Sequence, residues 1–216
     1  MSKVIKQEKQ TQVLLEVANL KAYYTTEQYG IVKEIKAVED VSINIEGNSF
    51  LAIVGESGCG KTTLARALYG AVDSTLSIIE GKVCYHFGDQ KYELSPNGND
   101  LKNIWWERIS YIPQGSLSAL NPVRRLRDIF SDLANSHGKT FDEQKVKDHL
   151  EMVNLPSYVL RIYPFELSGG MRQRSVIALA TFLKPDVIIA DEPTSALDVV
   201  TQRDILQLLS TIQNQS

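Results

Sequence analysis

The sequence is poor in cysteine, with only Cys59 and Cys84 among its 216 residues. Two isolated cysteines form neither a disulfide framework nor the clustered thiols of a zinc site. We therefore expect two reduced thiols in a cytosolic protein.

Long hydrophobic runs are also missing. The longest, FLAIV at 50–54 and VIIA at 187–190, have the length of strands and fall far short of the roughly 20 apolar residues that span a bilayer. Residues 1–12 are polar, so no signal peptide is expected. If the protein works at a membrane, we expect it to dock to other subunits.

The chain has no excess of basic charge. It holds 23 Lys and Arg against 26 Asp and Glu, a net charge of −3, which speaks against nucleic acid as the main partner. Its 43% hydrophobic and 23% charged residues are ordinary for a soluble globular domain. The length suffices for one domain with a small subdomain.

Hydrophobic periodicity predicts strands that alternate with helices, which favours a mostly parallel α/β sheet. Residues 50–54 are expected to form a strand buried on both faces. The stretch 113–170 is helical in character, with Leu126, Ile129, Phe130 and Leu133 at helical spacing. Strands are predicted at 13–20, 35–46, 50–54, 82–87, 109–112 and 187–190, and helices at 61–69, 170–182 and 199–213.

A phosphate-binding loop follows the apolar run at 50–54. Its residues Gly55, Glu56, Ser57, Gly58, Cys59, Gly60, Lys61 and Thr62 match G-x-x-x-x-G-K-[ST]. The glycines allow successive N–H groups to point at phosphate oxygens, and the following helix adds its positive end. We expect Lys61 to reach the β- and γ-phosphates and Thr62 to ligate Mg²⁺. We also expect Thr63, the next residue, to contact ATP.

Two carboxylates, Asp191 and Glu192, end the apolar run at 187–190. Ligands bind where the strands of an α/β sheet end. We predict that Asp191 holds Mg²⁺ and that Glu192 orients or deprotonates the attacking water.

Further motifs carry a resemblance to the ABC ATPases. LSGGMRQR at 167–174 resembles their LSGGQ signature, with Met171 where Gln is commonest and where oligopeptide-type importers often have Met. Gln114 in YIPQ resembles the Q-loop glutamine, and residues 195–198 (SALD) resemble the D-loop. Tyr24 matches the aromatic residue that stacks on adenine, with Tyr23 the neighbouring candidate. SLSALNPV at 116–123 resembles a segment of the oligopeptide/dipeptide/nickel importer group.

The resemblance implies a P-loop NTPase fold of ABC type: a RecA-like α/β core, an N-terminal antiparallel β subdomain and an inserted α-helical subdomain. We expect a disordered N-terminus at 1–11. The core then covers 12–112, the helical subdomain 113–170, and the continuation of the core 171–216.

The resemblance also implies the remaining roles. Gln114 contacts Mg²⁺ and the γ-phosphate. The other ATP contacts are Asp198 and, across a head-to-tail dimer, Ser168, Gly169 and Gly170. The implied partners are a second ABC ATPase subunit and transmembrane permease subunits, with the protein peripheral at the cytoplasmic face of the membrane. The expected function is ATP hydrolysis that powers an importer, with peptide, nickel or oligosaccharide left open as cargo.

The sequence departs from the family pattern at one point. Members carry a switch histidine after the strand that follows the acidic pair, whereas His86, His137 and His149 all precede that pair. We expect these three at the surface, and we expect a truncated chain that hydrolyses ATP slowly or not at all. Two alternatives remain: a soluble ABC ATPase of DNA repair or translation, and a nucleotide-binding module without turnover.

Overall fold

A computed structural model describes residues 13–28, 31–72, 74–96, 101–115, 119–195 and 197–215, with only the backbone of Gln28, Ile31 and Gln215. The chain divides into two compact units, Met1–Thr63 with Val72–Asp100, and Leu64–Ala71 with Leu101–Ser216. Among the described residues, no helix combines the length and apolar character needed to cross a membrane. The expectation of a disordered segment at 1–11 lies outside the described residues.

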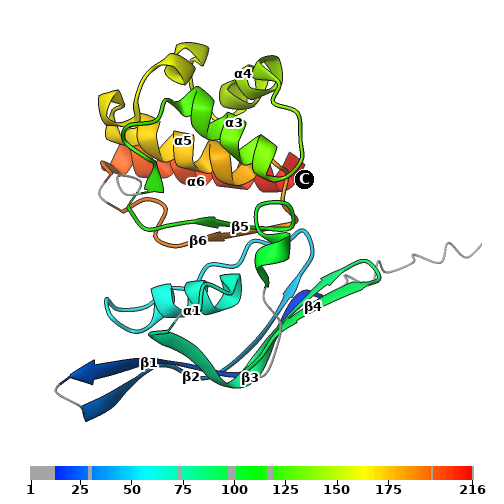
Figure 1. Cartoon of the computed structure of the whole chain (residues 1–216), viewed down its shortest axis with the longest axis vertical. Coiled ribbons are helices and arrows are strands. Elements are labelled where there is room, and N and C mark those ends of the chain that lie inside the picture. The colour runs from blue at the N-terminus through cyan, green and yellow to red at the C-terminus, as the bar shows by residue number, and fades with distance from the viewer. Residues whose placement is uncertain are drawn as a thin grey trace, which may run out of the picture. The chain divides into compact units, whose positions relative to one another are not determined.

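The first unit contains an antiparallel four-stranded sheet in the order β2-β1-β3-β4 (Figure 1). The strands are β1 (Val13–Gln28), β2 (Ile31–Glu46), β3 (Leu76–Phe87) and β4 (Gln90–Leu94). In β2, half-buried Val41, Ile43 and Ile45 alternate with exposed residues, so this strand covers the core with one face. Helix α1 (Lys61–Tyr69) follows the phosphate-binding loop.

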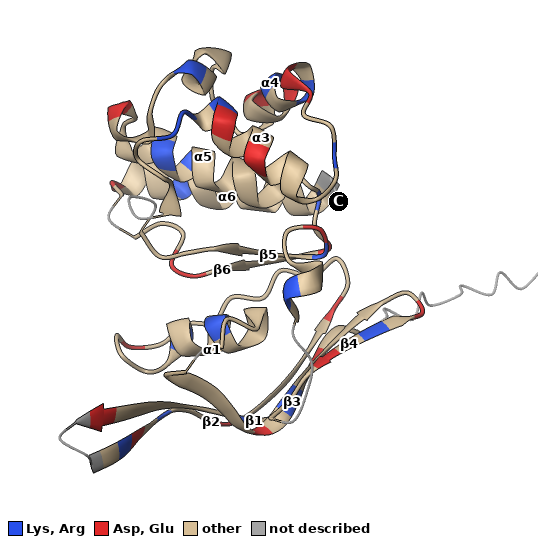
Figure 2. Ribbon diagram, viewed as in Figure 1, with Lys and Arg blue, Asp and Glu red and all other residues tan. Residues whose placement is uncertain are grey.

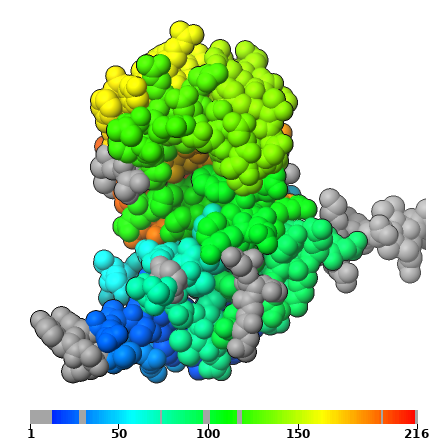
Figure 3. Space-filling model, in the orientation of Figure 1, coloured from blue at the N-terminus to red at the C-terminus, as the bar shows by residue number. Residues whose placement is uncertain are grey.

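The second unit packs helices against a parallel pair of strands, β5 (Ile109–Ile112) and β6 (Val187–Ala190). One hydrophobic core joins Ile112 of β5 to apolar residues of all four longer helices. In Figure 3, green and yellow-green atoms cover the face of this unit that is turned to the viewer. The helices are α3 (Leu126–Ser136), α4 (Glu143–Met152), α5 (Gly169–Thr181) and α6 (Val199–Gln215), with shorter 3₁₀ turns η1 (Leu101–Ile104), η2 (Ser157–Arg161) and η3 (Pro164–Glu166).

Most predicted elements are confirmed. The helix at 61–69 and the strands at 109–112 and 187–190 have the predicted bounds, and the helix predicted at 170–182 begins and ends one residue earlier. The helical character of 113–170 is confirmed for its described residues by α3 and α4. The strands predicted at 13–20, 35–46 and 82–87 extend further than expected.

The prediction of a buried strand at 50–54 is wrong. These residues join neither described sheet, and their apolar side chains are exposed, Phe50 by 59% and Val54 by 91%. An apolar run indicates that a segment tends to be buried, but it does not specify which neighbouring strands would pair with the segment and bury it. The described part of the parallel sheet is correspondingly limited to β5 and β6.

The three histidines, which are expected at the surface, are each half-buried. His149 in α4 places its Nε2 2.9 Å from the carbonyl oxygen of Ala178 and 3.0 Å from the Thr181 hydroxyl of α5. His137 contacts the carbonyl oxygens of Leu133 and Trp105. Helical periodicity predicts which face of a helix is buried from its apolar residues alone. It therefore does not predict the burial of a histidine that packs through hydrogen bonds.

We predict that Phe130→Ala strongly destabilises the second unit. Phe130 is fully buried, and its ring meets that of Phe182 edge-on at 5.2 Å between centroids. Such truncations cost about 3–5 kcal/mol because they leave a cavity. Denaturant unfolding measures the loss, and Phe165→Ala is the matched control because Phe165 is 65% exposed. Equal losses in the two variants would contradict the assigned core.

We also predict a pH-dependent contribution from His149. Burial lowers the pKa of this imidazole, with a smaller effect from Lys184. In the unfolded chain this imidazole takes up a proton near pH 6.5, whereas in the folded chain it does so only at lower pH. The free energy of unfolding therefore falls as pH drops below about 6.5. Thermal unfolding between pH 7.5 and 5.5 should show a shallower dependence of Tm on pH in His149→Gln than in the unsubstituted protein. An unchanged slope in His149→Gln would count against this assignment.

Candidate functional site

The phosphate-binding loop turns on two glycines with left-handed backbone angles. Gly58 has φ +80° and Gly60 has φ +96°, a region that side chains disfavour. At Gly60, a Cβ would also lie 2.2 Å from the carbonyl oxygen of Ala37. Glycine is therefore required at this position both by conformation and by the close approach of β2.

Lys61 folds back onto the loop that precedes it. Its Nζ donates to the carbonyl oxygens of Gly55 and Glu56, each at 2.8 Å, and lies 3.7 Å from the Sγ of Cys59. The ammonium group is thus held against the same loop that the motif assigns to phosphate. Thr62 is half-buried and Thr63 is buried at the start of α1.

The pairing of β5 with β6 brings two predicted site residues together. Ile112 lies opposite Ala190 in the parallel register, so both strands end at the same edge of the sheet. Gln114 and Glu192 each follow two residues later, and Gln114 Nε2 donates to Glu192 Oε2 at 2.7 Å. Residues that are 78 apart in the sequence therefore meet because their strands end together.

The two carboxylates of the acidic pair have different environments. Asp191 is buried, with 4% of its surface exposed, and its Oδ2 accepts from the Tyr111 hydroxyl at 3.0 Å. Glu192 is exposed and has a left-handed φ of +45°, a conformation that costs a non-glycine residue about 1–3 kcal/mol. Its carbonyl oxygen accepts from the Ser195 N–H at 3.0 Å, which fixes the turn. The chain thereby directs one carboxylate inward and the other to solvent.

The LSGGM segment forms the start of α5. Ser168 is the N-cap, and its Oγ accepts from the Met171 N–H at 3.2 Å. Gly169 and Gly170 form the first turn, where a Cβ on Gly170 would come within 3.1 Å of the Thr201 side chain in α6. The segment therefore combines an exposed helix N-terminus, which attracts anions, with close packing against α6.

Asp198 is the N-cap of α6. Its carboxylate accepts from the N–H groups of Val200 and Thr201 at 3.1 and 3.0 Å and from the Thr201 hydroxyl at 2.6 Å. The hydroxyl contact is the main reason that the pKa of this carboxyl is lowered. Sequence reasoning assigns Asp198 to ATP, whereas the structure gives it a helix-capping role. Its contact with ATP stays a prediction.

The two candidate adenine-stacking residues in β1 differ in environment. Tyr23 is buried, its hydroxyl donates to Glu39 at 2.6 Å, and Lys36 lies 5.4 Å from its ring centroid. Tyr24 is half-buried. Tyr24 is thus the more accessible of the two, and its stacking on adenine stays a prediction.

The predicted site residues are divided between the two units. The phosphate-binding loop and Tyr24 belong to the first unit, and Gln114, the acidic pair and the signature segment belong to the second. That all of them surround one nucleotide stays a prediction.

Sequence reasoning missed two features. Tyr111 holds Asp191, although a tyrosine within a strand carries no motif. Cys84, which is expected to be isolated, lies beside Glu16 and His86 on the four-stranded sheet. Only the strand register reveals this second group.

Comparison with known families gives a match to the ABC transporter model over residues 38–195. The chain belongs to the ABC transporter family. Among curated proteins, it is 39% identical to the dipeptide transport ATP-binding protein DppD of Caldanaerobacter subterraneus subsp. tengcongensis, over 93% of this chain and 61% of the relative. It is 37% identical to the oligopeptide transport ATP-binding protein AmiE of Streptococcus pneumoniae, over 85% of this chain and 52% of the relative.

A third ABC relative is the oligopeptide transport ATP-binding protein OppF of Salmonella typhimurium, with 35% identity over 100% of this chain and 64% of the relative. The chain thus spans between half and two thirds of the length of these relatives.

Solved structures of ABC cassettes share the fold. The ATP-binding cassette MJ0796, in a dimeric post-hydrolysis state bound to ADP and Pi, matches with a TM-score of 0.73 and 27% identity, over 94% of this chain and 84% of that chain. A second dimeric structure of MJ0796, described as a bacterial ABC transporter cassette, gives a TM-score of 0.74 at 26% identity, over 94% of this chain and 84% of that one. The predicted P-loop fold of ABC type is therefore confirmed.

We predict that Ser168→Ala destabilises α5 by about 1 kcal/mol, because the Met171 N–H loses its side-chain acceptor. Ser168→Asn should retain most of this stability because asparagine is an equally good N-cap. Denaturant unfolding of the three proteins tests the pair of expectations. If the alanine and asparagine variants unfold together at the wild-type midpoint, the cap contributes nothing.

Proposed function

We propose that this chain is an ATP-binding and ATP-hydrolysing subunit that powers an ABC importer, with peptides as cargo. It works as a dimer of ATPase subunits at the cytoplasmic face of a membrane, where it docks to permease subunits. The proposal rests above all on the contact between Gln114 Nε2 and Glu192 Oε2, 2.7 Å long. This contact holds an exposed carboxylate at a strand end beside a buried one.

The acidic pair supplies the proposed catalytic group. Glu192 orients or deprotonates the attacking water, as an exposed carboxylate fixed by an amide donor is suited to do. Gln114 then acts in two ways, because its Nε2 positions Glu192 while its amide oxygen is a potential metal ligand. Tyr111 keeps the Asp191 carboxylate in place from the other side.

The residues present fit Mg²⁺ by the chemistry of their donors. A carboxylate (Asp191), an amide oxygen (Gln114) and a hydroxyl (Thr62) would hold it, and all three are the hard oxygen ligands that Mg²⁺ prefers. When bound there, Mg²⁺ would supply positive charge that neutralises the charge developing on the phosphate oxygens.

The phosphate-binding loop supplies the proposed ATP contacts. Lys61 moves its hydrogen bonds from the carbonyl oxygens of Gly55 and Glu56 to the β- and γ-phosphates. Residues 55–60 surround the phosphates with backbone N–H groups, and Thr63 lies with Thr62 in the first turn of α1. Tyr24 stacks on the adenine.

The N-terminus of α5 supports a dimer in which one subunit completes the site of the other. Ser168, Gly169 and Gly170 form an anion-attracting helix start, which lies close enough to α6 that a Cβ on Gly170 would come within 3.1 Å of Thr201. We infer that this surface contacts the γ-phosphate bound to the partner, with Asp198 nearby. The dimeric state of the related cassettes supports this arrangement.

The choice of peptide as cargo rests on the relatives. The three curated proteins compared above are named for dipeptide or oligopeptide transport. Nickel and oligosaccharides are the alternatives, and transport assays with the cognate permease and binding protein distinguish them.

We predict that Glu192→Gln lowers ATP turnover by about 10²–10⁴-fold, because the water loses its carboxylate partner. Mg-ATP affinity should stay close to that of the unchanged protein, since the substitution removes an interaction of the transition state. Phosphate release and equilibrium binding of labelled ATP give the two quantities. Glu151→Gln, at an exposed position in α4, is the matched control and should leave both unchanged.

Full turnover by Glu192→Gln would contradict the catalytic role. Binding of ATP without turnover by the unsubstituted chain would instead favour a nucleotide-binding module. Absence of ATP binding would contradict the proposal altogether.

A further inference from the structure

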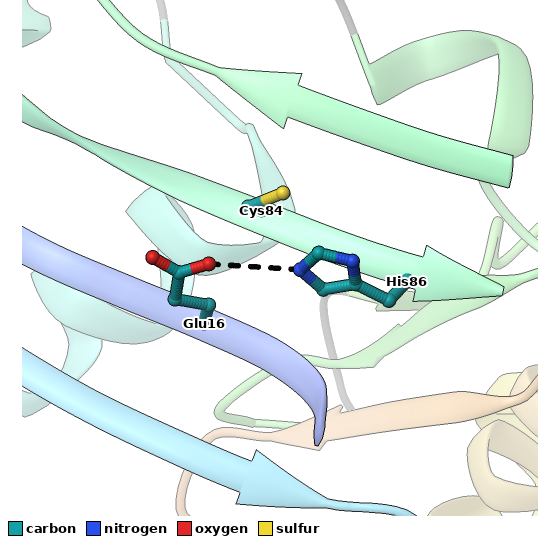
Figure 4. Close-up of side chains that lie close together, drawn as sticks. All are labelled: Glu16, Cys84 and His86. Atoms are coloured by element: carbon teal, nitrogen blue, oxygen red, sulfur yellow. Dashed lines mark ion pairs between the residues drawn. The ribbon is translucent and has the colours of Figure 1, made fainter. Parts of the chain in front are cut away.

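Three side chains of metal-ligating type gather on one face of the four-stranded sheet, apart from the proposed ATP contacts. They are Glu16 of β1 and Cys84 and His86 of β3, and their ligand atoms all lie within 4.8 Å of one another (Figure 4). Glu16 lies directly opposite Cys84 in the β1–β3 register. Cys84 and His86 are two residues apart on one strand and therefore point to the same face.

We propose that Glu16, Cys84 and His86 bind a divalent transition-metal ion of the zinc type. Thiolate sulfur, imidazole nitrogen and carboxylate oxygen are together the donors that Zn²⁺ uses, and a soft thiolate disfavours Mg²⁺ and Ca²⁺. Three protein ligands leave the fourth tetrahedral position to water.

The geometry is close to that of a tetrahedral site. Zinc bond lengths place neighbouring ligand atoms about 3.3–3.6 Å apart. His86 Nε2 lies 3.6 Å from Glu16 Oε2, so this pair already has the required separation. Since the ligand atoms lie within 4.8 Å of one another, the sulfur has to approach by at most about 1.2 Å to reach a zinc-type separation. A side-chain rotation covers this range, because the strand register already positions its Cα.

A neighbouring lysine orients the Glu16 carboxylate. Its other oxygen, Oε1, pairs with Lys82 Nζ at 3.1 Å, which leaves Oε2 directed at His86. A ligating carboxylate held by a second partner in this way is typical of metal sites. On β4, Glu93 lies opposite Cys84 and pairs with Lys91 at 3.3 Å. Figure 2 shows both signs of charge along these strands.

Access to the site is from the carboxylate and imidazole side. The side chains of Glu16 and His86 are 35% and 30% exposed, whereas Cys84 is fully buried. An entering ion meets Glu16 and His86 first. The S–H bond of the Cys84 thiol then breaks as the metal–sulfur bond forms, and the proton passes to solvent. The bound ion links β1 to β3 through side chains as well as through the backbone ladder.

The competing interpretation is an ion pair alone, in which protonated His86 contacts Glu16 and Cys84 only packs. The two interpretations differ in stoichiometric metal binding and in a sulfur–metal bond. Cobalt(II) is the probe of choice because it substitutes for Zn²⁺ and its thiolate complexes absorb in the near ultraviolet.

The experiment titrates Co²⁺ into the whole chain without nucleotide, in a Cys59→Ser background that removes the other thiol. We expect saturable binding of one ion with a thiolate-to-cobalt absorption band, displaced by one equivalent of Zn²⁺, and a higher Tm with Zn²⁺. Glu16→Gln and His86→Asn should each weaken binding at least tenfold. Cys84→Ser should abolish the band.

His137→Asn serves as the matched control, because it removes a half-buried histidine outside the group, and it should bind as the background does. The partly exposed Glu16 and His86 variants keep the test decisive if Cys84→Ser fails to fold. Absence of the band in the background protein, or affinity unchanged in both variants, would overturn the proposal.

Discussion

The candidate catalytic edge depends on the parallel pairing of β5 with β6. Because Ile112 stands opposite Ala190, the residues that follow each strand leave the sheet at the same edge. A shift of one residue in this register would turn each side chain to the opposite face. It would thereby separate Gln114 from Glu192 and Tyr111 from Asp191. The apolar face of α5, which packs on β5 within the shared core, holds the register in place.

The helical unit positions its functional segments through helix caps. Ser168 and Asp198 begin α5 and α6, and each satisfies N–H groups that would otherwise have no partner within the helix. The helix dipole and the remaining N–H groups of the first turn make a helix start attractive to anions. Because these two residues cap helices and are also proposed to contact ATP, loss of activity in a cap variant needs a stability measurement beside it.

The sequence predicted the local elements well where a motif or a periodic pattern was strong. The helix after Gly60 and the strand before Asp191 are examples, because glycine geometry and a short apolar run act locally. It failed at 50–54, since burial of that run depends on which strands lie beside it. It also failed at Cys84, because the contact with Glu16 arises from the pairing of β1 with β3 and no local pattern encodes that register. Half-buried His149 was missed for a similar reason, as its partners lie on another helix.

The contacts of Lys61 have a consequence for the selection of anions. Its ammonium group is already satisfied by two carbonyl oxygens at 2.8 Å, so an anion that enters the loop competes with them. To replace both carbonyl oxygens, the anion has to offer at least two oxygen acceptors to the ammonium group. Under the proposed function, the binding of phosphate at this loop thus includes an exchange of hydrogen-bond partners at one side chain.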